Sequence, residues 1–413
     1  MKPDLMRVTM FAGGGLAHTS GGVGTFIRYL EDEWATLPRG PKVRVIDSYG
    51  TGSKVGMACH FSWAVVCLLV MGATGRIDIL HVHMTFGGSA LRKGILTILG
   101  NVLRIPVIVH MHGSNFQESF AGLPGFAQRA LRFALSKARH IIVLGNSSRD
   151  FLVAEAGVSP EKIAIIFNGV PGPEEVVRPS SPPGGRVQIV FLGRLGERKG
   201  VPDLLAAFRS PQLLSRAWKA TIAGDGPVAE WRAAVVQAGL QDRVVVPGWL
   251  NRDATSDLLR TADIFVLPSH FEAMPVAILE ALAHRVAVVT TPVGAIPEFL
   301  SDGQNAVLVP PGAPDQLASA LARLIDDPGE RSRLGAAGHQ VFRDRFDISV
   351  AANQILALYQ DAAHVDSTRN GVGRGVGRGS PVASAGGASA SGKTANAPRA
   401  THTPGVPNAA MNG

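Results

Sequence analysis

The chain has 413 residues, of which 46% are hydrophobic and 17% charged, so it is too long for one ordinary core and too apolar to be wholly disordered. Its formal charge of +8 is uneven, because residues 1–171 carry seventeen Lys/Arg against ten Asp/Glu, whereas residues 172–365 carry eighteen against twenty-one. The cations are scattered and only 6% of residues are aromatic, so we expect no nucleic acid partner; an anionic membrane surface or a diphosphate-bearing acceptor suits the basic half better.

Residues 1–171 alternate short apolar runs with segments of helical spacing, such as 24–37 and 128–138. Alternation of this kind predicts a parallel, doubly wound sheet, and therefore a Rossmann-like α/β domain. Its strands are expected at 8–11, 43–46, 79–82, 107–110, 141–144 and 163–166.

The apolar run Phe61–Gly72 is twelve residues long, too short to cross a bilayer. Two interpretations stay open, a helix of the core or a surface that touches lipid. No secretory signal is visible, because residues 1–6 are polar and lead into the first strand. The two cysteines, Cys59 and Cys67, form no disulfide framework, which fits a reducing compartment.

After a Pro/Ser/Gly-rich linker at 172–186, the strand–helix pattern restarts in a second Rossmann-like domain, residues 187–345. Its strands are expected at 187–191, 219–222, 244–246, 264–267, 286–289 and 306–308. A ligand site is expected where the carboxyl ends of both sheets face each other.

The chain is predicted to close with helices at 314–326 and 348–363, the second within a C-terminal helical segment 346–365. Residues 366–413 change to Gly-Val-Gly-Arg repeats and then to Ser, Ala, Gly, Thr and Pro. Such a tail cannot bury enough apolar surface to offset its ordering entropy, so we expect it to be disordered.

Two glycine clusters, Gly13–Gly15 and Gly21–Gly24, follow the first strand and open a helix. Glycines let the backbone approach a ligand closely, and free amides at the helix start attract an anion. Nicotinamide dehydrogenases use a similar device, but Gly22-x-Gly24 lacks the full dinucleotide spacing.

Histidines lie in or directly after two of the predicted strands. His112 stands at the end of strand 107–110, where its side chain can reach the cleft or serve as a structural hydrogen-bonding group. His81 and His83 share one strand face, but no acidic or cysteine partner stands at metal-ligand spacing. We therefore reject a zinc site there.

Arg194 and Lys199 follow the first strand of the second domain. Two cations at a strand end can neutralise a diphosphate, Arg as a bidentate fork and Lys as a point charge. For an isolated pair, a solvated basic loop remains the alternative.

The segment from Pro268 to Glu280 places two carboxylates, Glu272 and Glu280, on a turn and on an apolar helix. Pro275 suits the first turn of that helix, because the missing N–H has no partner there. A carboxylate in an apolar helix is costly to desolvate unless it is paired. Strand, turn, free amides and two acids together favour a phosphorylated, hydroxyl-rich ligand.

The motif Pro-Ser-x-x-Glu-x-Met-Pro-x-x-x-Leu-Glu-Ala from Pro268, with Gly-Arg-Leu-x-x-x-Lys-Gly from Gly193, resembles the retaining family-4 glycosyltransferases of the GT-B fold. Asn168-Gly-Val and the stretch from Thr291 to Glu298 follow in family order. The resemblance covers roughly residues 7 to 360.

This resemblance implies two facing Rossmann-like domains, with the last helix crossing back onto the first. It implies a nucleotide-diphosphate sugar donor and no metal or other cofactor, since no Asp-x-Asp motif is present. The donor's ribose is assigned to Glu280, the transferred sugar to Glu272 and the vicinity of the reaction centre to His112. The diphosphate is assigned to Gly22, Arg194, Lys199 and the backbone amides around Met274–Val276, where Pro275 shapes the turn but has no N–H of its own.

One departure concerns the loop after Glu280-Ala-Leu-Ala, where the family usually has Gly then Pro and this chain has His284-Arg285. A positive φ at Arg285 would cost on the order of 1 kcal/mol.

The expected function is retaining, metal-independent hexosyl transfer, with mannose from GDP-mannose as the preferred donor. The basic N-terminal half and the apolar run resemble bacterial exopolysaccharide enzymes, which implies a polyprenyl-diphosphate-linked saccharide acceptor and a cytoplasmic protein, peripheral at the inner face of the cell membrane. Alternatives are a UDP-sugar donor with a soluble acceptor, a GT-B-like sugar-nucleotide epimerase, a dehydrogenase that lacks its fingerprint, and a non-catalytic nucleotide-sugar binding module.

Overall fold

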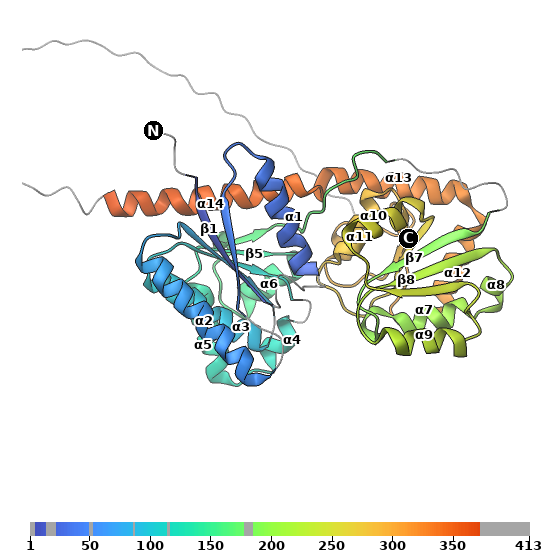
Figure 1. Ribbon diagram of the computed structural model, residues 1–413, viewed down its shortest axis with the longest axis horizontal. Coiled ribbons are helices and arrows are strands. Elements are labelled where there is room, and N and C mark those ends of the chain that lie inside the picture. The colour runs from blue at the N-terminus through green and yellow to red at the C-terminus, as the bar shows by residue number, and fades with distance from the viewer. Residues whose placement is uncertain are drawn as a thin grey trace, which may run out of the picture. The chain divides into compact units, whose positions relative to one another are not determined.

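The computed structural model describes residues 5–13, 22–48, 53–85, 87–113, 116–176 and 185–371. Within these ranges the chain forms two six-stranded sheets, all of whose paired strands run parallel, each associated with helices (Figure 1). The predicted α/β architecture of two Rossmann-like domains is confirmed.

The first sheet has the strand order β2-β1-β3-β4-β5-β6. Its apolar strands are separated by helices that supply the crossovers a parallel sheet requires. The elements are β1 (Arg7–Ala12), α1 (Gly22–Thr36), β2 (Lys42–Asp47), α2 (Lys54–Ala73), β3 (Ile79–Met84), α3 (Gly88–Val102), β4 (Val107–Met111), α4 (Phe116–Ala121), α5 (Gly125–Ser136), β5 (His140–Val143), α6 (Asn146–Ala154), η1 (Pro160–Lys162) and β6 (Ile163–Ile165).

The second sheet has the order β12-β11-β10-β7-β8-β9. Its elements are β7 (Val187–Leu192), η2 (Glu197–Lys199), α7 (Val201–Phe208), α8 (Pro211–Leu214), β8 (Trp218–Ala223), α9 (Val228–Gln237), β9 (Val244–Gly248), α10 (Arg252–Thr261), β10 (Ile264–Leu267), α11 (Val276–Ala283), β11 (Ala287–Thr290), η3 (Ile296–Glu298), β12 (Val307–Leu308), α12 (Pro314–Asp326) and α13 (Pro328–Arg345).

The two faces of the first sheet belong to different cores. One face packs its Leu80, Val82 and Val109 side chains with α2, α3 and α5. The other face is continuous with the core of the second domain through α1 and α14 (Ile348–Gly371). Alternation along each strand sends successive side chains to opposite faces, which explains this division.

The last helix crosses back onto the first domain, as expected. Trp34 donates its indole N–H to the Ala352 carbonyl at 3.3 Å, and the Tyr359 hydroxyl lies 2.6 Å from His81 Nδ1. Asp361 accepts from Arg139 at 3.1 Å and pairs with His140 at 2.8 Å. These contacts fix α14 against α1, β3 and β5 (Figure 1).

All twelve predicted strands are present, with ends shifted by at most two residues. Three helices differ from prediction, and one of them, α5, begins three residues before the predicted segment 128–138. The apolar run of twelve residues lies in the 20-residue helix α2, and α14 continues to Gly371, past the predicted end at 363. From residue 372 on, the predicted disordered tail lies outside the described residues, as do 177–184 of the linker. Arg285 adopts φ 59°, the left-handed conformation anticipated for that loop.

Candidate active site

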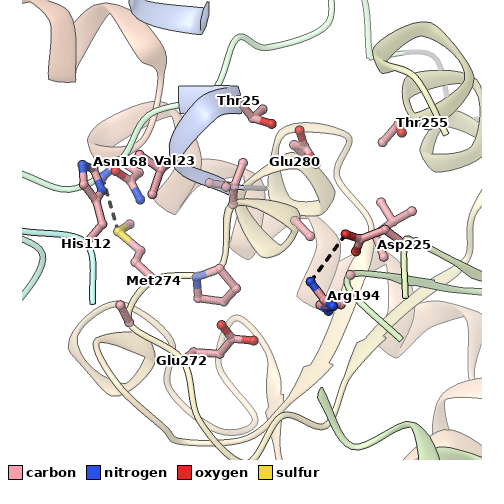
Figure 2. A pocket seen from close by; sticks show the side chains of 18 of the residues that line it. Val23, Thr25, His112, Asn168, Arg194, Asp225, Thr255, Glu272, Met274 and Glu280 are labelled. Carbon is pink, nitrogen blue, oxygen red and sulfur yellow. Dashed lines mark hydrogen bonds and ion pairs between the residues drawn. The ribbon is translucent and has the colours of Figure 1, made fainter. Parts of the chain in front are cut away.

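A cleft of about 770 Å³ lies between the carboxyl ends of the two sheets. Both domains line it, and Figure 2 shows His112 and Asn168 at one side with Arg194 and Asp225 at the other. Every residue predicted for the site lines this one cleft: Gly22, His112, Arg194, Lys199, Glu272, Met274, Pro275, Val276 and Glu280.

Two helices begin at the cleft, α1 at Gly22 and α11 at Val276. They approach closely, since a Cβ on Gly22 would lie 3.5 Å from Val276 Cγ2. Unpaired amides and the positive end of the helix dipole make each start favourable for an anion. The rest of the predicted glycine loop, Gly14, Gly15 and Gly21, lies outside the described residues.

Lys199 and Glu272 form an ion pair inside the cleft, and both side chains are largely buried. Ser269 also donates its hydroxyl to the same Glu272 oxygen, at 2.7 Å. Sequence reasoning assigned Lys199 to phosphate and Glu272 to sugar as separate roles. The structure joins them into one unit, so a ligand that meets the ammonium also meets the carboxylate.

Two glycines allow this unit to form. Gly200 has φ 70°, and a Cβ there would lie 2.0 Å from the Pro268 carbonyl oxygen. Gly294 has φ 59°, and a Cβ there would lie 2.1 Å from the Glu272 carbonyl oxygen. Only glycine accepts both the left-handed conformation and this close backbone approach. They hold the segments carrying Lys199 and Glu272 against each other.

Arg194, in contrast, is 70% exposed, with Nη1 4.0 Å from the Asp225 carboxylate. A pair so exposed and so long contributes little stability. The guanidinium is therefore available to a ligand entering the cleft (Figure 2).

Glu280 is bound from across the cleft, because the Tyr29 hydroxyl of α1 donates to its Oε1 at 2.8 Å. Burial raises the pKa of Glu280 to about 7, while the hydrogen bond and the charge of Arg252 oppose that rise. Burial and the Glu280 carboxylate raise the pKa of Tyr29. Arg252 in turn lies over the Tyr29 ring at 5.0 Å and pairs with Asp32 at 3.1 Å.

His112 is buried at the cleft wall, and burial lowers its pKa to about 3. The ring is therefore neutral near pH 7, with Nε2 2.9 Å from His83 Nδ1. Its Nδ1 has no hydrogen-bond partner among the described residues. A neutral imidazole can donate or accept one hydrogen bond to a sugar but supplies no positive charge.

The structure adds a third histidine, His110, to His81 and His83, so three imidazoles lie within reach of one ion. Sequence reasoning had found no third ligand. The rings, however, stack with interplanar angles of 19°, 11° and 29°. Lone pairs of stacked rings run alongside one another instead of converging on a tetrahedral centre. The arrangement favours packed neutral rings.

Asn168 is a cleft residue that sequence reasoning treated only as part of a supporting motif. Its side chain is 4% exposed, and Oδ1 has no hydrogen-bond partner among the described residues. Its backbone N–H donates to Met274 Sδ at 3.3 Å, and it lines the cleft together with His112 (Figure 2). Tyr29 and Arg252 were also missed, because no local motif marks them.

A second pocket of about 340 Å³ adjoins the cleft and shares Gly113, Leu144, Glu272 and Ala273 with it. Aromatic rings and small polar groups line it together: Phe116, Phe151, Phe271, Gln117, Ser147, Ser148 and His270. Such a mixture suits a hydroxyl-bearing ring compound.

Two family models match the chain: "Glycosyltransferase Family 4" over residues 20–171 and "Glycosyl transferases group 1" over residues 186–327. The two matches cover the two Rossmann-like domains in order.

Similar proteins include the alpha-D-kanosaminyltransferase of Streptomyces kanamyceticus, 24% identical over 68% of this chain and 77% of that protein. The putative colanic acid biosynthesis glycosyltransferase WcaL of Salmonella typhimurium is 32% identical over 49% of this chain and 52% of that protein. Among solved structures, HepE of Anabaena in complex with UDP and glucose superposes with a TM-score of 0.66 at 18% identity, covering 86% of this chain and all of that one. This likeness shows a shared fold.

Proposed function

Because this chain is a glycosyltransferase of the GT-B fold, we propose that it moves a hexosyl group, with retention and without a metal, from a nucleotide-diphosphate sugar to a hydroxyl of a lipid-linked saccharide. The observation that carries the proposal is the convergence of two helix starts, Arg194 and the Lys199–Glu272 pair on one cleft.

In this mechanism the acceptor oxygen attacks the anomeric carbon as the bond from that carbon to the β-phosphate oxygen breaks. The acceptor proton passes to the departing phosphate, so no protein base is needed. Negative charge grows on the phosphate, where Arg194, Lys199 and the amides at Gly22 and Val276 stabilise it. Preorganised donors of this kind supply about 2–4 kcal/mol each.

The remaining cleft residues divide between the two ends of the donor. Glu280 accepts the ribose hydroxyls once Tyr29 yields its hydrogen bond. Glu272, His112 and Asn168 surround the transferred sugar. Both predicted carboxylates already have protein partners, which supports a clamp of cations and amides in place of a metal.

GDP-mannose is the donor we propose first, on the family resemblance, and a UDP-sugar is the alternative, supported by the UDP-bound structural neighbour. For the acceptor, we propose a polyprenyl-diphosphate-linked saccharide of an exopolysaccharide pathway, supported by the colanic acid relative, with the protein peripheral at the inner membrane face. A soluble acceptor is the second candidate, supported by another similar protein, the 2-deoxystreptamine glucosyltransferase of Streptomyces kanamyceticus, whose name gives an aminocyclitol as acceptor.

The test is a panel of GDP-mannose, UDP-glucose, UDP-galactose and UDP-N-acetylglucosamine, each offered with a polyprenyl-diphosphate saccharide and with a soluble aminocyclitol. Nucleotide release, product mass and the anomeric configuration by NMR are recorded, with and without a chelator. An inverted anomer would overturn retention, and loss of turnover on chelation would overturn metal independence. Nucleotide release from none of these donors would contradict the proposed transfer.

A further inference from the structure

The helix α2 is apolar on its outward face. Residues Val55–Ala73 have a mean hydropathy of 1.9, yet only 17% of the window is buried. Val55 is 72% exposed and Trp63 64%, and Val66, Leu69 and Val70 are exposed as well. These positions recur with helical spacing on the side away from the core. An outward face normally carries polar residues, so α2 is neither the core helix of the first interpretation nor an ordinary surface helix.

Two neighbouring helices extend this surface. α3 contacts both α2 and α5, and these helices also expose large apolar side chains: Leu91, Ile95 and Val102 on α3, with Phe126 and Phe133 on α5. We call the exposed side of these helices the α2–α3–α5 face. Extended apolar surfaces of this kind mark sites of protein or membrane contact.

The charges of the three helices favour a membrane over a protein as the partner of this face. None of α2, α3 and α5 contains an Asp or Glu, whereas Arg92, Arg129 and Arg132 lie on α3 and α5. Lys137 follows α5, with its ammonium 4.6 Å from the Phe133 ring centre. A surface of cations without carboxylates attracts anionic headgroups, whereas a second copy would bring like charges together. Apolar side chains beside cations are the composition of helices that lie in a lipid interface.

α2 is anchored to its domain, so we expect it to lie along a bilayer and not across it. Ala64, Leu68 and Met71 are buried in the same core as Leu80 and Leu96. Crossing a bilayer would withdraw these side chains from that core. Trp63 and Phe126, both highly exposed, are suited to the headgroup region.

This face is linked to the second pocket. Arg132 of α5 lies 5.0 Å from the ring centre of Phe120 on α4, and Phe120 stacks on Phe116, which lines the pocket. Figure 1 shows α2, α3, α5 and α4 gathered on one side of the first sheet. We propose that the α2–α3–α5 face binds an anionic bilayer surface with α2 parallel to it, bringing the second pocket to lipid-linked acceptors. The acceptor part of this inference rests on the proposed function.

The test is flotation of the full chain with vesicles of phosphatidylcholine, with and without phosphatidylglycerol, in the absence of any substrate. Wild type should float with the anionic vesicles and far less with the neutral ones. The triple variant Trp63→Ser, Val66→Ser, Phe126→Ser should bind on the order of a hundredfold more weakly. Arg129→Glu should weaken binding to anionic vesicles alone, by about fivefold or more.

The matched control is Leu214→Ser with Val236→Ser, two exposed apolar residues of the second domain, which should float as wild type does. Circular dichroism and donor hydrolysis without vesicles verify that the triple variant is folded. Flotation of that variant equal to wild type would overturn the inference. So would a vesicle-free dimer that the triple variant converts to monomer, because the face would then belong to a second copy. Since flotation needs no substrate, its result is independent of the donor and acceptor panel.

Discussion

The two Rossmann-like domains share one architecture but line the cleft with different chemistry. The second domain contributes ion pairs, Lys199 with Glu272 and Arg194 with Asp225. The first contributes the amides at Gly22, the neutral ring of His112 and the uncharged side chain of Asn168, and its charged cleft residues, Arg28 and Asp32, both lie on α1. This difference suggests a division of labour in which charge is neutralised from one side and a neutral sugar is hydrogen-bonded from the other.

The strongest test of this difference between the domains is to remove Lys199, the largely buried cation of the cleft. Lys199→Ala should lower kcat/KM by about a hundredfold to a thousandfold, because it removes a preorganised charge from the leaving phosphate. Steady-state kinetics with the donor identified by the panel measures the loss. Lys219→Ala, at an exposed lysine of β8, is the matched control and should behave as wild type. Full activity in the Lys199 variant would remove the second domain's cations from the mechanism.

The corresponding change in the first domain is Asn168→Leu, of similar volume. If Oδ1 accepts from the sugar, kcat/KM should fall by about tenfold, the effect of losing one hydrogen bond. The free energy of unfolding should hold or rise, since an unpartnered buried oxygen disappears. Kinetics and chemical denaturation on the same sample separate the two effects. A destabilised variant with normal kinetics would make Asn168 structural.

Local motifs placed the predicted residues of the second domain at one cleft, because strand, turn and helix follow within a few residues. Arg194 and Lys199 share one such path and Glu272 and Glu280 another, whereas the Lys199–Glu272 contact between the two paths spans 73 positions and was not predicted. The Tyr29–Glu280 hydrogen bond joins residues 251 positions apart, and no periodicity encodes it. Asn168 and Met274 are likewise 106 positions apart. The exposure of α2 could not be predicted from the sequence either. The spacing of apolar residues shows that a helix is hydrophobic, but it does not show which parts of the protein cover that helix.

A third prediction uses pH to sharpen the role of Glu280. Its pKa near 7 means that the carboxylate is mostly ionised at pH 8 and mostly protonated at pH 6. Donor affinity, measured by calorimetry, should therefore fall by up to about tenfold between these values if ribose binds the ionised form. Glu280→Gln should bind weakly and without this dependence. Tyr29→Phe removes a hydrogen bond that lowers the pKa, so it should move the transition to higher pH.

The pH dependence of stability tests the same carboxylate independently of donor binding. A folded-state pKa raised above the ordinary value of 4.5 means that the folded protein binds the extra proton between about pH 4.5 and 7. The contribution of Glu280 is therefore most favourable below that range and is lost as pH rises through it. Glu280→Gln should be more stable than wild type at pH 8 and nearly equal at pH 4.5. If the difference in stability between Glu280→Gln and wild type did not change with pH, the Glu280 carboxylate would be solvated and not buried.

The buried histidines of the first domain should make stability depend on pH in the opposite direction. Burial lowers the pKa of His110 well below 6.5, so the unfolded chain binds more protons and stability is lost as pH falls below that value. Neither His110 nitrogen has a partner among the described residues, so His110→Leu sacrifices no hydrogen bond known from them. Thermal unfolding should show it more stable than wild type at pH 5 and little changed at pH 8, with turnover unaffected. Since Glu280→Gln gains stability at high pH and His110→Leu at low pH, the pair tests whether both buried groups are held uncharged in the folded protein. A His110 variant that loses stability equally at both pH values would show that ring stacking, not neutrality, is what this position contributes.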